Sequence, residues 1–307
     1  MKKSQSEIMN KISYHYLSFK GVKVIRDYKF LKTIDGKELH LEISESGKKK
    51  WLIVTHGIGE HLNRHSYIDE LFGSSFNILK YDIRGHGRSQ GLKKGYVDNF
   101  SDFFSDLKEV ILFLKKSYKM ESFCLFGHSM GALITAGYMQ NLADAENYPD
   151  AVFLNAPPAG FPGALGEIMN ISPLGFVNKL TSLPFSLKLG GLVDLDYLSH
   201  DNRVKENYIE DEFNILKPHS KLLFEMVKAS KEVFSRPLRI TCPSFISYGT
   251  EDRVVSIPKL ESYLELVDKS FKVEKIEGAY HETHNEIEKY RTPYFKFLKD
   301  SLLSVLN

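Results

Sequence analysis

The pentapeptide Gly127-His-Ser129-Met-Gly131 constrains the fold of this chain more than any other stretch. The apolar residues 123–126 before it are typical of a short buried strand in a parallel sheet, and residues 130–139 after it of a helix. Ser129 therefore falls on a sharp turn between the two. At the flanking glycines a side chain would collide with the neighbouring strand or helix. This context predicts a nucleophilic hydroxyl at the start of a helix.

Predicted strands and helices alternate on both sides of this turn. Short apolar runs typical of buried strands fall at residues 51–56, 76–81, 151–155, 244–248 and 271–276. Asp35-Gly36, between residues 23–32 and 39–44, is a strong hairpin signal and predicts two antiparallel strands at a sheet edge. Residues 1–22 show only weak periodicity, and we expect them to form a surface extension.

The alternation breaks at residues 158–237, where glycine and proline separate short amphipathic pieces. Strand and helix alternate again after residue 238. The pattern predicts an α/β fold, with a mostly parallel central sheet flanked by helices. We expect its core to consist of residues 1–157 and 238–307, and residues 158–237 to form an inserted helical lid or cap.

The composition is that of an ordinary globular protein, with 42% apolar and 26% charged residues among 307. A net charge of +2 gives no reason to expect a nucleic-acid partner. Cys124 and Cys242 fall on or beside predicted strands, and we interpret them as small buried apolar residues. The N-terminus lacks the apolar segment of a signal peptide, and no apolar run is long enough to span a bilayer. We therefore expect a cytoplasmic protein that contacts membranes only peripherally.

A serine nucleophile requires a histidine base and an acid that orients the histidine. In this topology the acid and then the histidine follow later strands, at the edge of the sheet where Ser129 emerges. Asp252 follows the strand at 244–248, and His281 follows the strand at 271–276. We assign Asp252 as the acid and His281 as the base. Their nearest competitors are the neighbouring side chains Glu251 and His284; we expect His284 to start the next helix and to face outward.

Attack on a carbonyl creates an oxyanion that needs preorganised N–H donors. One donor is the backbone N–H of Met130, directly after the nucleophile. The second is predicted after the strand at residues 51–56, where the small Gly57 lets the backbone approach the substrate. We assign the Ile58 N–H to this role.

Metal and cofactor motifs are not convincing in this sequence. His61 and His65 stand at helical spacing, but no glutamate lies between them and no third ligand accompanies them. The sequence His281-Glu-Thr-His284 also lacks the spacing of a zinc helix. The glycine-rich loop at residues 85–90 has glutamine where a dinucleotide fingerprint needs its third glycine. We predict no metal and no cofactor.

Five motifs occur together in the order seen in α/β-hydrolases: His56-Gly-Ile-Gly-Glu-His61, Asp82-Ile-Arg-Gly-His-Gly-Arg-Ser89, Gly127-His-Ser-Met-Gly131, Gly249-Thr-Glu-Asp252 and Gly278-Ala-Tyr-His-Glu282. They resemble the branch of monoacylglycerol lipases and lysophospholipases. The resemblance covers residues 40–155 and 238–305. It implies a cofactor-free ester hydrolase that forms an acyl-serine on lipid monoesters beneath a mobile apolar lid. Ala132 departs from the second glycine of many relatives, and the lid matches no pattern of the family.

Four hypotheses follow for the function. The first is a serine hydrolase that releases one fatty acyl chain from monoacylglycerol or lysophospholipid. The second is a carboxylesterase of smaller esters, if the apolar lid residues only pack the cap. An aminopeptidase of the same fold is less favoured because no acidic pair is evident to bind an amine. The fourth is a non-catalytic binding protein, which the complete set of triad residues disfavours.

Overall fold

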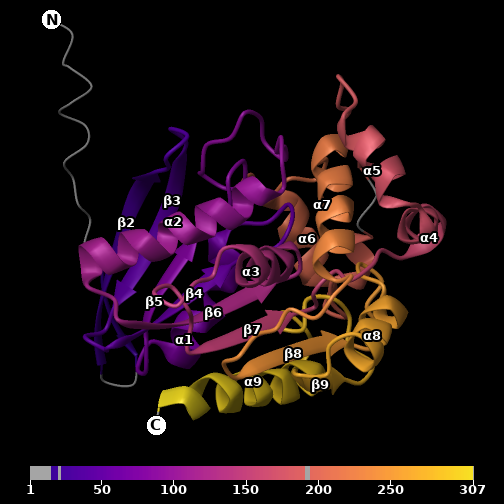
Figure 1. The fold of residues 1–307 in the computed structure, drawn as a ribbon. Coiled ribbons are helices and arrows are strands. Elements are labelled where there is room, and N and C mark those ends of the chain that lie inside the picture. The colour runs from indigo at the N-terminus through magenta and orange to yellow at the C-terminus, as the bar shows by residue number, and fades with distance from the viewer. Residues whose placement is uncertain (1–14, 20–21, 191–193, 307) are drawn as a thin grey trace, which may run out of the picture.

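The computed structural model describes residues 15–19, 22–190 and 194–306. In this part of the chain one sheet has the strand order β1-β2-β3-β5-β4-β6-β7-β8-β9 (Figure 1). The strands are β1 (His15–Phe19), β2 (Val22–Lys32), β3 (Glu38–Glu45), β4 (Lys50–Thr55), β5 (Asn77–Tyr81), β6 (Ser122–His128), β7 (Ala151–Asn155), β8 (Ser244–Gly249) and β9 (Lys272–Ile276). The six strands from β5 to β9 in this order pair in parallel, and β1, β2 and β3 pair antiparallel. The predicted mostly parallel sheet is confirmed.

The predicted hairpin is formed by β2 and β3, and its turn places Gly36 at a φ of +82°. It does not lie at the sheet edge, however, and that part of the prediction is wrong. β1 pairs antiparallel along the outer side of β2, within the stretch that we expected to be a surface extension. An uncovered strand as long as β2 would present a row of unpaired backbone groups, which β1 satisfies in part. Residues 1–14 lie outside the described part.

Helices cover both faces of the sheet (Figure 1). One face is packed by α2 (Ser101–Tyr118), α3 (Met130–Asn141) and α8 (Ile257–Leu266). The other is packed by α1 (Tyr67–Phe72) and α9 (Glu288–Leu303). Alternate side chains of β4 show why both faces are apolar: Ile53 joins the first core, and Leu52 and Val54 join the second.

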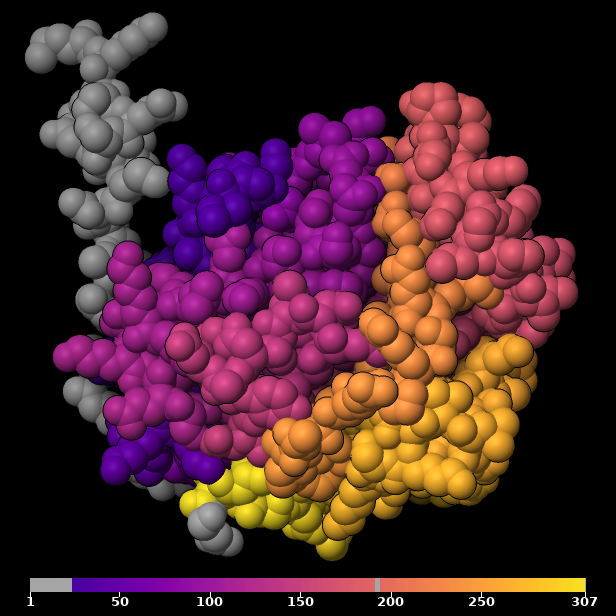
Figure 2. Space-filling model, viewed as in Figure 1, coloured from indigo at the N-terminus to yellow at the C-terminus, as the bar shows by residue number. Residues whose placement is uncertain are grey.

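The segment between β7 and β8 carries helices and no named strand, as far as it is described. It contains α4 (Gly163–Ile171), α5 (Leu174–Thr181), η3 (Leu195–Tyr197), α6 (Asn202–Glu210) and α7 (Ser220–Val233). We call residues 158–237 the inserted segment. Met169 of α4 and Val177 of α5 pack against Val227 of α7, forming a small core of their own. In Figure 1 α4 and α5 lie beyond the sheet and the helices that cover it, and in Figure 2 this part of the chain forms one corner of the molecule.

The helices of the described residues were compared with the length and apolarity that a bilayer span requires. None of them meets both criteria.

Candidate active site

Ser129 occupies the sharp turn between β6 and α3 that the pentapeptide predicts. Its backbone has φ 52° and ψ −118°, a strained conformation for a residue with a side chain. A Cβ at Gly127 would overlap the carbonyl oxygen of Gly131, and a Cβ at Gly131 would overlap that of Thr55. The Ser129 N–H donates to the carbonyl oxygen of Asn155, at 2.8 Å, which fixes the turn to the neighbouring strand. The two glycines are therefore required by the packing of the turn.

Loops at the carboxyl ends of β6, β8 and β9 bring the predicted nucleophile, acid and base together. Ser129 Oγ lies 3.0 Å from His281 Nε2. On the other side of the ring, His281 Nδ1 lies 2.6 Å from Asp252 Oδ2. Asp252 also accepts the backbone N–H groups of Val254 and Val255, at 2.7 and 3.0 Å, which fixes its carboxylate. The competing Glu251 is exposed.

The protonation of His281 follows from these contacts. A carboxylate only accepts hydrogen bonds, so Nδ1 carries the proton that is donated to Asp252, and Nε2 is left to accept the Ser129 hydroxyl proton. Burial alone lowers the pKa of His281, but Asp252, and to a smaller extent Glu282 and Glu60, more than offset this. The pKa is therefore raised above its ordinary value of 6.5. The ring can accept a proton from Ser129 more readily than an unperturbed imidazole.

His284 does not face outward at the start of a helix, and that prediction is wrong. Its side chain is buried, and its ring centroid lies 5.0 Å from those of His65 and His128. The following helix, α9, begins only at Glu288. Within the loop that carries His284, the buried carboxylate of Glu286 accepts the Tyr280 N–H at 2.8 Å, so the two ends of the loop are held together.

Both predicted oxyanion donors belong to residues close to Ser129. Met130 is the first residue of α3, so its N–H has no acceptor within the helix. Ile58 and Ser129 line the same cavity. Gly57, the residue before Ile58, lies so close to Ser129 that a Cβ on Gly57 would be 3.2 Å from Ser129 Cβ.

His56 shapes the loop that carries Ile58, and sequence reasoning assigned it no role. Its Nε2 accepts the Ile83 N–H at 2.9 Å, so its Nδ1–H donates to the Gly57 carbonyl, at 2.8 Å. Burial lowers the pKa of His56 to about 4, which keeps the ring neutral and able to make both bonds. The position of this histidine, directly after a buried strand and before Gly57, is the signal that indicates such a role.

An apolar cavity of about 410 Å³ extends from Ser129 into the inserted segment. Its walls come from α4, α5, α7 and the loop after Asp252, and they include Phe161, Met169, Leu180, Phe224, Val227 and Val255. A second cavity, of about 450 Å³, lies on the other side of Ile58 and is lined in part by Tyr208 and Lys217. Ser129 therefore stands at the end of an apolar space large enough for a hydrocarbon chain.

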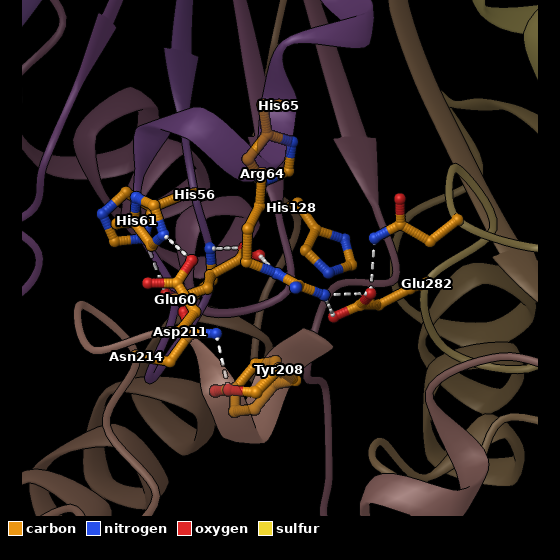
Figure 3. A network of polar contacts seen from close by, with 12 residues as sticks. His56, Glu60, His61, Arg64, His65, His128, Tyr208, Asp211, Asn214 and Glu282 are labelled. Atoms are coloured by element: carbon orange, nitrogen blue, oxygen red, sulfur yellow. Dashed lines mark hydrogen bonds and ion pairs between the residues drawn. The ribbon is translucent and has the colours of Figure 1, made fainter. Parts of the chain in front are cut away.

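A buried polar network surrounds Glu60, beside Ser129 (Figure 3). One oxygen of Glu60 accepts the Gly57 N–H and, at 3.0 Å, the His65 Nε2–H. The other accepts Arg64 Nε–H at 3.2 Å. Arg64 also donates to Glu282, which directly follows His281. The sequence motifs gave no role to Arg64 or Glu282. The spacing of four residues from Glu60 to Arg64 is the signal that could have indicated an ion pair between those two side chains.

Glu60, His65 and His284 are buried, and within the described residues they form a group whose ligand atoms could hold a metal ion. These atoms lie within 4.8 Å of one another. Both carboxylate oxygens of Glu60 already accept hydrogen bonds, and its charge is opposed by Arg64. Glu60 and His65 are therefore hydrogen-bonded to each other, whereas neither ring nitrogen of His284 has a hydrogen-bond partner among the described residues.

Comparison with known proteins gives a family and a fold. The family model described as serine aminopeptidase, S33 (Hydrolase_4), matches residues 46–288. Monoglyceride lipase of Mus musculus is 27% identical over 280 residues, which cover 85% of this chain and 86% of that protein. The crystal structure of Paleococcus ferrophilus monoacylglycerol lipase is similar with a TM-score of 0.70 at 23% identity, covering 83% of this chain and 94% of that one. A carboxyl esterase from Bacillus coagulans also has a TM-score of 0.70, at 18% identity, covering 92% and 99%. The two structures establish the fold.

Proposed function

This chain belongs to the family of α/β-hydrolases described as serine aminopeptidase, S33, and on that premise we propose that it hydrolyses esters of a single long fatty acyl chain. It is a serine ester hydrolase that acts on lipid esters. Monoacylglycerol or a lysophospholipid is the proposed substrate. The sequence similarity to monoglyceride lipases supports the first of these.

The observation that carries this proposal is the apolar cavity that ends at Ser129. Each methylene of an acyl chain that enters such a space contributes about 0.8 kcal/mol to binding. A chain of many methylenes would therefore be strongly preferred over an acetyl group. Glu60 and Glu282 line the small space around Ser129 and His281, and both pair with Arg64 (Figure 3).

The proposed mechanism uses Ser129, His281 and Asp252 in the roles assigned from the sequence. His281 Nε2 takes the Ser129 proton as Oγ attacks the ester carbonyl, and the Ile58 and Met130 N–H groups bind the oxyanion. The protonated histidine then gives that proton to the departing alcohol, which leaves an acyl-serine. A water molecule, deprotonated by the neutral His281, attacks the acyl carbonyl. The histidine then gives this proton to Ser129 Oγ as the acyl–oxygen bond breaks, which releases the fatty acid and restores Ser129 and the neutral His281. Asp252 stabilises the imidazolium in both steps.

We also propose that the inserted segment is a lid that faces lipid surfaces. Large apolar side chains of α4, α5 and the loop after them are exposed: Leu165, Ile168, Ile171, Phe176, Phe185 and Leu187. The helices α4 and α5, which carry the first four of these side chains, lie in the part of the chain that forms the corner seen in Figure 2. Contact with a membrane or micelle would cover them and bring the substrate close to the cavity.

Short-chain esters are the alternative substrate, and a peptide amine is disfavoured. Recognition of an amine requires a carboxylate that is free to pair with it. In the described residues, the carboxylates that line the space around Ser129 are Glu60 and Glu282, and both already bind Arg64. Neither is available for a substrate amine.

Turnover on a substrate panel tests the proposed function. The panel contains a long-chain monoacylglycerol, a lysophosphatidylcholine of the same acyl chain, p-nitrophenyl acetate and an amino-acid p-nitroanilide, with Ser129→Ala as the control. We expect one of the two lipids to have the highest kcat/KM and the anilide to remain uncleaved. Turnover of p-nitrophenyl acetate alone would favour the short-chain alternative.

A further inference from the structure

Three segments far apart in the sequence meet at the side chain of Arg64. Arg64 lies in η2 (Leu62–His65), which follows the loop that carries Gly57 and Ile58. Its guanidinium donates to both oxygens of Glu282 through Nη2, at 2.7 and 2.5 Å, in the loop of His281. The same group lies 4.8 Å from the ring centroid of Tyr208, in α6 of the inserted segment. Figure 3 shows Arg64 reaching from Glu60 to Glu282, with Tyr208 on its third side.

The connections at both ends of Arg64 lead to groups beside Ser129. At one end, Glu60 joins Arg64 to the Gly57 N–H, one residue before the proposed donor Ile58. At the other end, Glu282 is the residue after His281. Backbone bonds reinforce this end, because the His281 and Glu282 N–H groups donate to the carbonyls of residues 197 and 198, at 3.2 and 2.8 Å. The guanidinium therefore links the loop of the oxyanion donor to the loop of the base.

We propose that Arg64 and Glu282 are positioning residues, which hold the Ile58 N–H and His281 at a fixed separation around Ser129 and balance the charge beside the base. This inference rests on the roles given to Ile58 and His281 in the proposed function. Neither residue reacts; each acts through a neighbour on the backbone.

The charges around His281 make the second part of the inference specific. Asp252 faces Nδ1, Glu282 follows in the same loop, and Glu60 faces it from the loop after β4. His128, whose ring centroid is 5.0 Å away, is neutral because burial lowers its pKa to about 3. Arg64 is thus the cation that opposes the two glutamates of this group, and all three side chains are buried or nearly so.

Three substitutions separate geometry from charge. Arg64→Lys keeps the positive charge but cannot bind Glu60 and Glu282 through separate nitrogens of a planar fork. We expect kcat to fall about 10-fold to 100-fold, with KM and the pH profile unchanged. Glu282→Gln removes a negative charge, and we expect the acid limb of kcat/KM to move down by about one pH unit. Arg64→Met removes the positive charge and should move the acid limb of the kcat/KM profile to higher pH, also by about one pH unit.

Matched controls test whether these effects are local. Arg203→Met removes an exposed guanidinium in α6, which pairs with Asp201, and Glu265→Gln removes an exposed carboxylate in α8. Both controls should retain the kinetics of the original chain. A general loosening of the fold would not move the acid limb in opposite directions in Glu282→Gln and Arg64→Met. If Arg64→Met does not fold, Arg64→Lys still tests the positioning role and Glu282→Gln still tests the charge balance.

The result is read in two ways. The first is the kinetic profile with the preferred ester. The second is the pKa of the His281 ring, measured by NMR on protein with ¹⁵N-labelled histidine in a Ser129→Ala background, which needs no substrate. A kcat for Arg64→Lys equal to that of the original chain, or an unshifted His281 pKa in Glu282→Gln, overturns the inference. Failure to hydrolyse any ester would instead refute the proposed function, and the NMR shifts would still test the charge balance.

Discussion

Filling the apolar cavity should change which acyl chains are hydrolysed. Val227 of α7 lines the cavity and packs against Met169 of α4 and Val177 of α5. In Val227→Phe the side chain gains about four carbons, which displace a similar number of acyl methylenes worth about 0.8 kcal/mol each. The loss is then about 3 kcal/mol, or roughly 150-fold in kcat/KM for a palmitoyl ester. An acetyl ester is too short to reach the added ring and should be hydrolysed at the original rate.

The assay compares kcat/KM for p-nitrophenyl acetate and p-nitrophenyl palmitate in detergent. Val204→Phe, the same change in α6 at a residue that lines neither described cavity, is the control and should leave both values unchanged. A thermal melt shows whether Val227→Phe has remained folded. Equal losses for the two esters, or no loss for palmitate, would refute the assignment of this cavity to the acyl chain.

The remaining predictions concern the residues around the turn. Ser129→Ala should abolish nearly all turnover while the melting temperature stays close to the original, because the change removes a single oxygen atom. His281→Ala should also abolish nearly all turnover, but its melting temperature should fall, because the buried ring packs against His128 and binds the Asp252 carboxylate. Gly131→Ala should reduce the free energy of unfolding by more than about 3 kcal/mol in urea titration, since its Cβ would overlap the carbonyl oxygen of Thr55, and a stable variant would contradict this reading of the turn. Asp252→Asn should lower kcat and move the acid limb of kcat/KM downward. The base must be neutral, so kcat/KM rises with pH through the raised pKa of His281, and removing the carboxylate that raises it lowers that pKa. An acid limb that stays in place would contradict the role of Asp252.

Features set by a few adjacent residues could be predicted from the sequence. The turn at Ser129 depends on glycines two residues away, and Asp35-Gly36 is enough to specify the hairpin of β2 and β3. The mostly parallel sheet and its flanking helices could be predicted from the alternation of apolar runs and helical patterns. Asp252 and His281 could be placed because loops after parallel strands meet at one edge of the sheet.

Features that depend on distant contacts could not be predicted in this way. β1 forms because β2 offers an uncovered edge, and nothing in its own weakly periodic sequence specifies that pairing. His284 is buried in a loop whose backbone is bound at Tyr280 by the Glu286 carboxylate. A sequence pattern does not reveal such a contact between a side chain and the backbone.

The network around Arg64 is the clearest case. Arg64 and Glu282 are 218 residues apart, and each is of a type that is usually exposed to solvent. Only the folded chain brings them together, with Glu60, beside Ser129. Their pairing depends on the fold as a whole, so no local sequence pattern could have predicted it.

Labelling by alkyl fluorophosphonates tests the central claim most directly, because it reports the nucleophile and the cavity together. The measurement compares the second-order rate constants of a hexadecyl and an ethyl fluorophosphonate, and peptide mass spectrometry locates the adduct. We expect both reagents to modify Ser129 alone, with the hexadecyl reagent faster by at least 100-fold if about four or more methylenes enter the cavity. Absence of an adduct on Ser129, or equal rates for the two reagents, would contradict a serine hydrolase built around an acyl-binding cavity.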